Sequence, residues 1–377
     1  MSGIYFHIPF CKQACHYCNF HFSTSLKHRD AVLQAMKKEL RYFAEKGWQG
    51  PLETVYFGGG TPSLLSVDEI EGLVGEVARY FGLSDGAEIT LEANPDDLDL
   101  QRIKALKESP VNRISLGVQS FEAADLRWMN RAHTPGQALE ALEGIAKYFD
   151  NFSLDLIYGI PGSDLKQWES NLSRALDFRP PHLSAYALTV EPKTALHSFI
   201  ERGLSPDVED EAAQRQFQHM VQRLEEAGYD HYEVSNFALP GYYSRNNSAY
   251  WQGKHYLGIG PAAHSFDGKR RWWNPSHNLK YVKAWQADAS PAEVEALSDR
   301  DRYNELVMTG LRTRWGVSLN KVREDFGAVY EAYLRQQAAP YLKEQLLFLD
   351  GDVLYTTRKG KFLADGIASD LFMINLK

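Results

Sequence analysis

Cysteine is scarce in this sequence: only three of the 377 residues are cysteines, and all of them stand in the stretch CKQACHYC, as Cys11, Cys15 and Cys18. Small secreted domains that depend on disulfides spread their cysteines along the chain to join distant loops. This distribution excludes that class, and a hydrophobic content of 44% is enough to build a core without covalent staples. The placement of every thiol in one short stretch needs another explanation.

Long apolar runs and an excess of basic residues are also missing. No run approaches the roughly 18 apolar residues that cross a bilayer. The opening stretch MSGIYFHIPF lacks the basic and apolar regions of a signal peptide. We therefore expect a soluble cytoplasmic protein in a reducing compartment. The net charge of −8 argues against a nucleic-acid binder, because such proteins need positive charge to displace counterions from phosphates.

Up to about residue 236 the chain alternates short runs rich in β-branched and aromatic residues with longer amphipathic segments. Most of the short runs are too apolar to have one wet face, which indicates parallel strands covered on both sides. The strands that we expect are 3–9, 54–59, 87–93, 112–120, 152–159, 182–188 and 231–237. Repeated βα units give an open doubly wound sheet or a barrel. Loops of very different length favour an α/β fold with an incomplete (β/α)6-type barrel over residues 1–236.

Two of the amphipathic segments carry signals of helix ends. Ser66 and Glu69 form the S-x-x-E pattern of a capping box, ahead of apolar residues that fall on one helix face. A later helix is expected to bury the apolar residues of 217–224 along one stripe and to end before Gly228, a residue that favours helix termination.

From residue 298 the pattern changes to helix, turn and helix, followed by a hairpin that turns at 350–352 and a final helix. This order predicts a winged-helix-like α+β domain over 298–377, joined to the barrel by a connecting segment, 237–297. Charges in the domain nearly balance and no basic helix face is present. We therefore expect a packing or docking domain rather than DNA recognition.

Three explanations compete for the cysteines. A chance cluster of structural thiols is one, and a zinc site completed by His7, His16 or His21 is the second, because structural zinc takes four ligands. The third is an iron–sulfur cluster bound by three thiolates, which leaves one iron of a cubane free for a small molecule. The loop follows the first strand and so lies at the mouth of the barrel, where such folds carry out chemistry. This position favours the iron–sulfur cluster.

The run GIYFHIPFCKQACHYCNF, with its C-x-x-x-C-x-x-C spacing, resembles the radical S-adenosylmethionine (SAM) family. The resemblance is to the subgroup of oxygen-independent coproporphyrinogen III oxidases and the related haem chaperones of the HemW branch, and it covers nearly the whole chain. It implies a radical SAM barrel and a [4Fe–4S] cluster bound by Cys11, Cys15 and Cys18. SAM is then expected to chelate the fourth iron, and the protein to position it for cleavage by an electron from the cluster.

The resemblance also assigns residues to the SAM site. Gly59, Gly60 and Thr61 in GGGTP are expected at the methionine end of SAM, where glycines let the backbone come close to a ligand. Glu92 in LEANP is expected at a strand end, facing the ribose hydroxyls. The other residues that the resemblance places around SAM and the cluster are Tyr5, Tyr17, Gln119, Arg131, Asp155, Ala187 and His264.

Two departures favour the chaperone branch. The oxidases carry a fourth cysteine two residues after the third, where this chain has Phe20, and they have a longer arm before the first strand. The chaperones carry an H-N-x-x-Y-W motif associated with haem. Here Asn247, Tyr250 and Trp251 match it, so we expect them to contact haem, but Asn246 replaces the histidine. Asparagine cannot serve as the axial ligand of iron, which leaves His231, His255 and His264 as candidates.

The resemblance therefore predicts a haem chaperone that binds haem, one [4Fe–4S] cluster and SAM, and delivers haem to apo-haemoproteins of the respiratory chain. The alternative is an oxygen-independent coproporphyrinogen III oxidase, a radical SAM dehydrogenase that converts propionates to vinyls. A zinc-stabilised scaffold is a third hypothesis. Whether SAM is cleaved, and so whether the protein is an enzyme, stays open at this point, as do its oligomeric state and a transient membrane association. No basic amphipathic helix indicates such an association.

Overall fold

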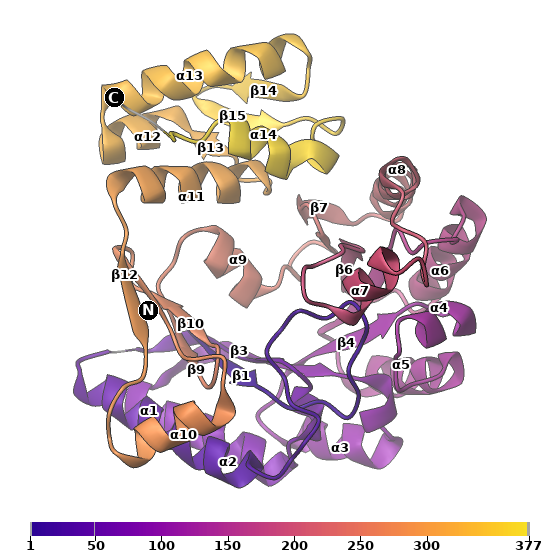
Figure 1. The fold of residues 1–377 in the computed structure, drawn as a ribbon, viewed down its shortest axis with the longest axis vertical. Helices are drawn as coiled ribbons and strands as arrows, with labels where there is room; N and C mark the ends of the chain where they lie inside the picture. Colours follow the sequence, from indigo (N-terminus) through magenta and orange to yellow (C-terminus); the bar gives the residue numbers. More distant parts are fainter. Residues whose placement is uncertain (1, 49, 375–377) are drawn as a thin grey trace.

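Parallel strands form the centre of the protein in the computed structural model, which describes residues 2–48 and 50–374 (Figure 1). These strands are β1 (Gly3–Ile8), β2 (Leu52–Gly59), β3 (Leu83–Ala93), β4 (Arg113–Gln119), β5 (Phe152–Tyr158) and β6 (His182–Ala187). They are neighbours in chain order, and each pair runs parallel. The apolar runs thus form the parallel strands that the sequence predicts. Phe6 and Phe57, partners in register, stack with ring centroids 4.8 Å apart in the core.

Helices alternate with these strands and bury apolar faces against the sheet. They are α1 (Arg29–Glu45), α2 (Val67–Phe81), α3 (Leu100–Glu108), α4 (Ala123–Trp128), α5 (Pro135–Tyr148), α6 (Leu165–Asp177), α7 (Ala195–Glu201) and α8 (Asp210–Glu226). The capping box of α2 is confirmed, because Ser66 Oγ accepts from the Glu69 amide and the Glu69 carboxylate accepts from the Ser66 amide. The predicted stripe of α8 is also buried, and the helix ends before Gly228, whose φ is +88°.

The prediction of one strand over 231–237 is wrong. The segment forms two short antiparallel strands, β7 (Asp230–Glu233) and β8 (Asn236–Ala238), and β8 pairs antiparallel with β6. A carboxylate explains the turn between them: Glu233 Oε2 accepts from the Ser235 amide at 2.9 Å and from Asn236 Nδ2 at 2.6 Å. The chain therefore reverses where a continuous strand was expected.

The segment 237–297 extends the other end of the large sheet. Its strands are β9 (Tyr256–Ile259), β10 (His264–Phe266), β11 (Arg270–Trp273) and β12 (Glu293–Ala296), and it also holds α9 (Arg245–Trp251) and α10 (Asn278–Gln286). Strand β9 lies parallel to β1, and β10 to β12 follow in antiparallel order. The segment predicted to be a connection thus contributes strands to the sheet of the barrel, while the division of the chain into three domains stays a prediction.

The C-terminal part has its own core and a small sheet. Its elements are α11 (Asp299–Leu311), β13 (Val317–Ser318), α12 (Leu319–Phe326), α13 (Ala328–Lys343), β14 (Leu347–Asp350), β15 (Val353–Thr356) and α14 (Ala364–Asp370). The hairpin turns at Gly351, whose φ is +59°, and β15 lies between β13 and β14. Tyr303, Val307 and Leu334 are fully buried in this core. The two predicted helices, the hairpin and the final helix are present in the predicted order, which confirms the winged-helix-like fold class, but the sequence analysis did not predict α13, which lies between α12 and the hairpin.

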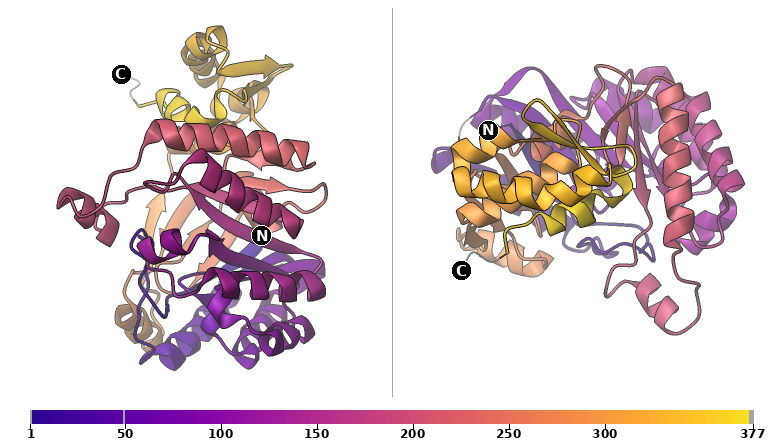
Figure 2. Two further views of the ribbon diagram at one scale, coloured as in Figure 1. Left: turned by 90° about the vertical axis from the view of Figure 1, so that its right-hand side faces the viewer. Right: turned by 90° about the horizontal axis from the view of Figure 1, so that it is seen from above.

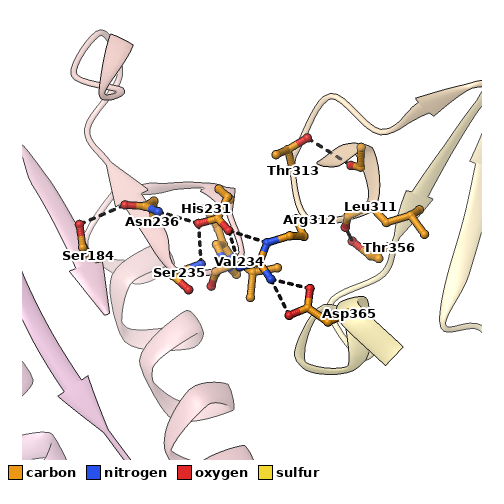
Figure 3. Close-up of polar contacts among 12 residues, drawn as sticks. Ser184, His231, Val234, Ser235, Asn236, Leu311, Arg312, Thr313, Thr356 and Asp365 are labelled. Carbon is orange, nitrogen blue, oxygen red and sulfur yellow. Dashed lines mark hydrogen bonds and ion pairs between the residues drawn. The ribbon is translucent and has the colours of Figure 1, made fainter. Parts of the chain in front are cut away.

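Helix α11 joins the two ends of the large sheet. It begins directly after β12, and the loop that follows it pairs with the β7 end, where the Val234 amide donates to the Arg312 carbonyl at 2.9 Å. The Arg312 side chain bridges Glu233 and Asp365 at the same place (Figure 3). Figure 2 shows the C-terminal domain, in orange and yellow, lying over the sheet beside α8. None of the helices in the described part of the chain has both the length and the hydropathy of a membrane span.

Candidate functional site

The cysteine loop that follows β1 is fastened to the segment after α4 by polar contacts. Asn130 Nδ2 donates to the Ala14 carbonyl at 2.7 Å, and Gln13 Nε2 donates to Asn130 Oδ1 at the same distance. The His16 amide donates to the Met129 carbonyl at 3.1 Å. These contacts fix the loop between the first and third cysteines over the mouth of the barrel.

The GGGTP turn after β2 supports the start of the same loop. The Gly60 amide donates to the Ile8 carbonyl at 2.9 Å, and the Thr61 amide donates to the Phe10 carbonyl at 2.7 Å. A Cβ atom on Gly60 would lie 2.7 Å from the Phe10 oxygen, and one on Gly59, whose φ is +104°, would lie 2.7 Å from His7 Nδ1. The glycines therefore let two stretches of backbone pack in contact, which a larger residue would prevent.

A first cavity of about 430 Å³ opens at the carboxyl ends of the parallel strands. Most of the predicted site residues line it, although they come from loops and strands far apart in the sequence. They are Cys11, Cys15, Cys18, Tyr17, Gly59, Gly60, Thr61, Glu92, Gln119, Arg131, Asp155 and Ala187. Tyr5 and His264 do not line this first cavity. The structure thus brings together the three cysteines and nine of the eleven residues that were predicted to surround SAM.

The three thiols are free and lie close enough to influence one another electrostatically. Burial raises the pKa of Cys11 to about 11, against the hydrogen bond from Thr61 that lowers it. Burial likewise raises the pKa of Cys18. Arg131 offsets negative charge here, because its Nη1 lies 3.5 Å from the Cys15 sulfur. Partly buried thiols beside a fixed guanidinium suit thiolates that are bound to metal.

These thiols fit an iron–sulfur cluster better than a single ion. Within residues 2–48 and 50–374, no three His, Cys, Asp or Glu side chains gather closely enough to hold one metal ion. A cubane does not need that convergence, because each of its cysteines binds a different iron. Thiolates are also the ligands that iron–sulfur chemistry prefers. The residues present therefore fit the group that the cysteine spacing implies.

Two carboxylates lie deeper in the first cavity. Glu92 Oε1 accepts from the Tyr56 hydroxyl at 2.8 Å, and burial raises the pKa of Glu92 to about 7. Asp155 accepts from Ser115 Oγ at 3.1 Å, and burial raises its pKa as well. Arg113, which is also buried, offsets part of this charge. Such carboxyl groups can accept hydrogen bonds from the hydroxyls of a bound sugar.

A second cavity of about 920 Å³ adjoins the first. Asn19, Phe20, Tyr186 and Asn247 line both cavities, and Phe20, with 65% of its surface exposed, lies where they meet. The remaining predicted residues line the second cavity, namely Tyr5, Tyr250, Trp251 and His264. The residues predicted for haem are thus next to those predicted for SAM, and Asn247, which was predicted for haem, lines both cavities.

Helix α9 carries the N-x-x-Y-W residues and is fixed by a carboxylate of β3. Glu88 Oε1 accepts from the Arg245 amide at 3.1 Å and from the Asn246 amide at 3.3 Å, at the positive end of the helix. Tyr250 and Trp251 lie edge to face with centroids 5.3 Å apart, and the Arg312 guanidinium lies 5.1 Å from the Trp251 ring. Figure 1 shows α9 between α11 and the large sheet.

Comparisons with known proteins agree with this geometry. The model of the radical SAM superfamily matches residues 5–175, and that of the HemN C-terminal domain matches residues 297–363. The heme chaperone HemW of Lactococcus lactis is 36% identical over 97% of this chain and 98% of its own length. The chain belongs to the HemW branch of the radical SAM family. The heme chaperone HemW of Bacillus subtilis is 33% identical, over 97% of this chain and 98% of its own length.

One solved structure confirms the fold of this HemW-family chain. Coproporphyrinogen III oxidase (HemN) from Escherichia coli, a radical SAM enzyme, superposes with a TM-score of 0.84 and covers 98% of this chain and 89% of its own. Its sequence is 22% identical, so the similarity concerns the fold alone. Membership of the radical SAM family implies binding of a [4Fe–4S] cluster and SAM, for which the first cavity has the residues.

Of the three histidines considered for haem in this HemW-family chain, the structure brings only one to a cavity. His231 is half-buried, with its ring stacked on Phe237 at 4.1 Å and Nε2 3.1 Å from the Val234 carbonyl. His255 lines neither cavity described above. His264 lines the second cavity, and its ring stacks on Trp273 at 5.8 Å.

Sequence reasoning missed several residues of the first cavity. Asn94 connects two predicted ones, since its Oδ1 accepts from Arg131 Nη2 at 2.6 Å and its Nδ2 donates to Thr61 Oγ1 at 3.3 Å. Its place just after Glu92, at a strand end, is a signal that could have identified it. Arg113 opens an apolar strand, and nothing in its neighbours indicates that its side chain lies under the cavity.

Proposed function

We propose that this protein is a haem chaperone that holds a [4Fe–4S] cluster and SAM in the first cavity and haem, as cargo, in the second. The observation that carries the proposal is that a cavity lined by three cysteines adjoins a larger cavity with aromatic walls. The full-length relatives named heme chaperone support the same function. We further propose that the protein works in the cytoplasm and delivers haem to apo-haemoproteins of the respiratory chain.

In the first cavity, Cys11, Cys15 and Cys18 would bind the cluster, which would supply the electron for a reductive cleavage of SAM. Gly59, Gly60 and Thr61 offer backbone groups to the methionine end of SAM. The Glu92 carboxylate is placed to accept from ribose hydroxyls. Tyr17, Gln119, Arg131, Asp155 and Ala187 would enclose the rest of the cofactor.

In the second cavity, α9 would supply the haem contacts. Asn247, Tyr250 and Trp251 all line that cavity, and 46% of the Tyr250 surface is exposed. An exposed aromatic side chain beside a cavity provides a flat apolar surface for a planar ring system. Tyr5 and His264 belong with this group rather than with the SAM contacts.

The alternative function is that of an oxygen-independent coproporphyrinogen III oxidase, an enzyme that also needs a cluster, SAM and a porphyrin site. At the position of the oxidases' additional cysteine this chain has Phe20, whose exposed side chain lies between the two cavities. A cysteine there could take part in redox chemistry, whereas phenylalanine cannot. This observation supports the chaperone function.

One anaerobic preparation tests both functions. We expect iron and sulfide in the reconstituted protein and a saturable haem titration with a shift of the Soret band, without conversion of coproporphyrinogen III. Tyr250→Ala should weaken haem binding, whereas Phe348→Ala, an equally exposed aromatic residue of β14, should not. Failure of the protein to bind haem would refute the chaperone. Production of protoporphyrinogen would establish the enzyme instead.

A further inference from the structure

One face of the strands β1 and β9 to β12 forms a wall of the second cavity. Side chains of residues paired across neighbouring strands point to the same face, as do those two positions apart. His264 pairs with Trp273, and Arg271 pairs with Glu295, so all four side chains share this face. All four also line the second cavity. The wall therefore combines an aromatic ring, an imidazole and a guanidinium.

Of the three histidines that line this cavity, His264 is the one whose ring nitrogens have no hydrogen-bond partner among the described residues. Its ring stacks on Trp273 and makes no hydrogen bond with residues 2–48 or 50–374. The two other histidines of the cavity are engaged: His7 Nε2 lies 2.9 Å from the His21 carbonyl, and His21 Nε2 lies 2.8 Å from Asn278 Oδ1. A ring nitrogen with no partner in the protein is free to bind iron.

Arg271 is the cationic group of the wall. Its Nη2 lies 2.8 Å from Glu305 Oε1 of α11, which leaves other donors of the guanidinium for a ligand. Glu233, an acidic residue of the same cavity, is fully engaged by Arg312, Ser235 and Asn236. Glu295 lies on the exposed edge strand β12. A planar guanidinium binds a carboxylate through two parallel hydrogen bonds.

We propose that iron protoporphyrin lies against this wall with His264 as the axial ligand of iron and Arg271 bound to a propionate. The inference rests on the proposed chaperone function and names the residues that recognise its cargo. Asn246 replaces the motif histidine. Its backbone N–H donates to the Glu88 carboxylate, and its side-chain Oδ1 accepts from Thr54 Oγ1 at 3.3 Å. The imidazole that the motif lacks is thus supplied from β10, on the sheet side of the same cavity.

The His264 part of the proposal is tested by the spectrum of the haem complex. His264→Ala should lose the Soret and visible bands of histidine-ligated ferric haem that we expect for the wild-type complex, and added imidazole should restore ligation of the iron. His255→Ala is the matched control and should keep the wild-type spectrum, because His255 lies outside the cavity. A wild-type spectrum in His264→Ala would overturn the assignment, and so would loss of the bands in both variants. If His264→Ala does not fold, His264→Gln replaces it.

The Arg271 part is tested with haem and its dimethyl ester, which keeps the ring and the iron but has no carboxylate. Arg271→Gln should weaken binding of haem about tenfold, the equivalent of one charge-assisted hydrogen bond, and leave binding of the ester unchanged. Arg270→Gln is the matched control: Arg270 precedes Arg271 on β11 but does not line the second cavity, so this variant should not weaken haem binding. Equal losses for haem and ester, or no loss for either, would overturn this part.

Haem binding by the wild-type protein separates the proposed function from the assignment of His264 and Arg271. If the wild-type protein shows no saturable haem binding, the chaperone function fails and the inference fails with it. If the wild-type protein binds haem and the His264 and Arg271 variants bind it identically, the function stands and only the assignment of these residues is wrong.

Discussion

The Nη1 group of Arg131 lies 3.5 Å from the sulfur of Cys15, at the far end of a side chain that the rest of the site holds in place. Its Nη2 donates to Asn94 Oδ1 at 2.6 Å and to the Gly117 carbonyl at 2.9 Å. The nearby thiols and Tyr17 raise the pKa of Arg131 against the effect of burial, so it stays charged. The positive charge is therefore fixed beside the cysteines before any cluster arrives.

Replacing this charge should weaken retention of the cluster. We expect Arg131→Gln, reconstituted anaerobically, to lose iron to a chelator about tenfold faster than the wild type, because a charge-assisted hydrogen bond to a cluster ligand is gone. Loss of the visible absorbance of the cluster gives the rate. The control is Arg127→Gln on the exposed side of α4. Equal rates for the two variants would mean that Arg131 does not stabilise the cluster.

The close packing at Gly60 gives a second prediction. A methyl group there would lie within 3 Å of the backbone oxygens of both Ile8 and Phe10. Gly60→Ala should therefore lower the free energy of unfolding by about 1–3 kcal/mol and reduce the iron content. Gly75→Ala, in the middle of α2 with no atom within 4 Å of the new methyl, should raise it by about 0.5–1 kcal/mol. Urea denaturation measures the free energy of unfolding of both variants. If Gly60→Ala is as stable as the wild type, the packing argument is wrong.

The pKa of Glu92 predicts how stability changes with pH. Burial raises this pKa from 4.5 to about 7, so the folded protein binds the proton more tightly than the unfolded chain does. The contribution of Glu92 is fully present below pH 4.5 and is lost as the pH rises to about 7, by at most about 3 kcal/mol. Glu92→Gln should therefore gain stability relative to the wild type between pH 5.5 and 7.5.

The measurement is urea denaturation of the SAM-free protein at these two pH values. Tyr56→Phe provides a second test, because it removes the hydrogen bond that lowers the pKa of Glu92. The loss of folding stability with rising pH should then occur at a higher pH than in the wild type. If the difference in free energy of unfolding between Glu92→Gln and the wild type does not change with pH, Glu92 does not have the raised pKa.

The sequence predicts the parts of the fold that depend on local pattern. Six apolar runs became parallel strands, and the capping box at Ser66 starts a helix. The hairpin at 350–352 turns at a glycine with positive φ. In each case the information lies within a few residues, because apolar runs, caps and turns are recognised without knowing what they contact.

What the sequence could not predict depends on pairing over long distances. Strands β9 to β12 have only three or four residues each, too few for a periodic signal. Their register is what places His264 beside Trp273. Tyr5 was expected near SAM, but β9 pairs with β1 on the side away from β2, and Tyr5 lines the second cavity. The turn at Ser235 depends on the Glu233 carboxylate, which has no pattern of its own.

The last prediction concerns the ion pair of Arg312 with Glu233. Figure 3 shows Arg312 at the junction between the barrel and the C-terminal domain. Arg312 Nη2 donates to Glu233 Oε1 at 2.8 Å, and only 1% of the Glu233 side chain is exposed. Arg312→Gln leaves a buried carboxylate without its cation, so we expect the free energy of unfolding to fall by about 3–5 kcal/mol. Adding Glu233→Gln should recover part of that loss, because the uncompensated charge is gone.

The control is Arg314, which lies in the same loop as Arg312. Arg314→Gln breaks an exposed ion pair with Asp230 and should lower the free energy of unfolding by less than about 1 kcal/mol. Urea denaturation of Arg312→Gln, Glu233→Gln and the double variant gives the coupling energy of the pair. Purely additive effects would show that this pair does not hold the two domains together.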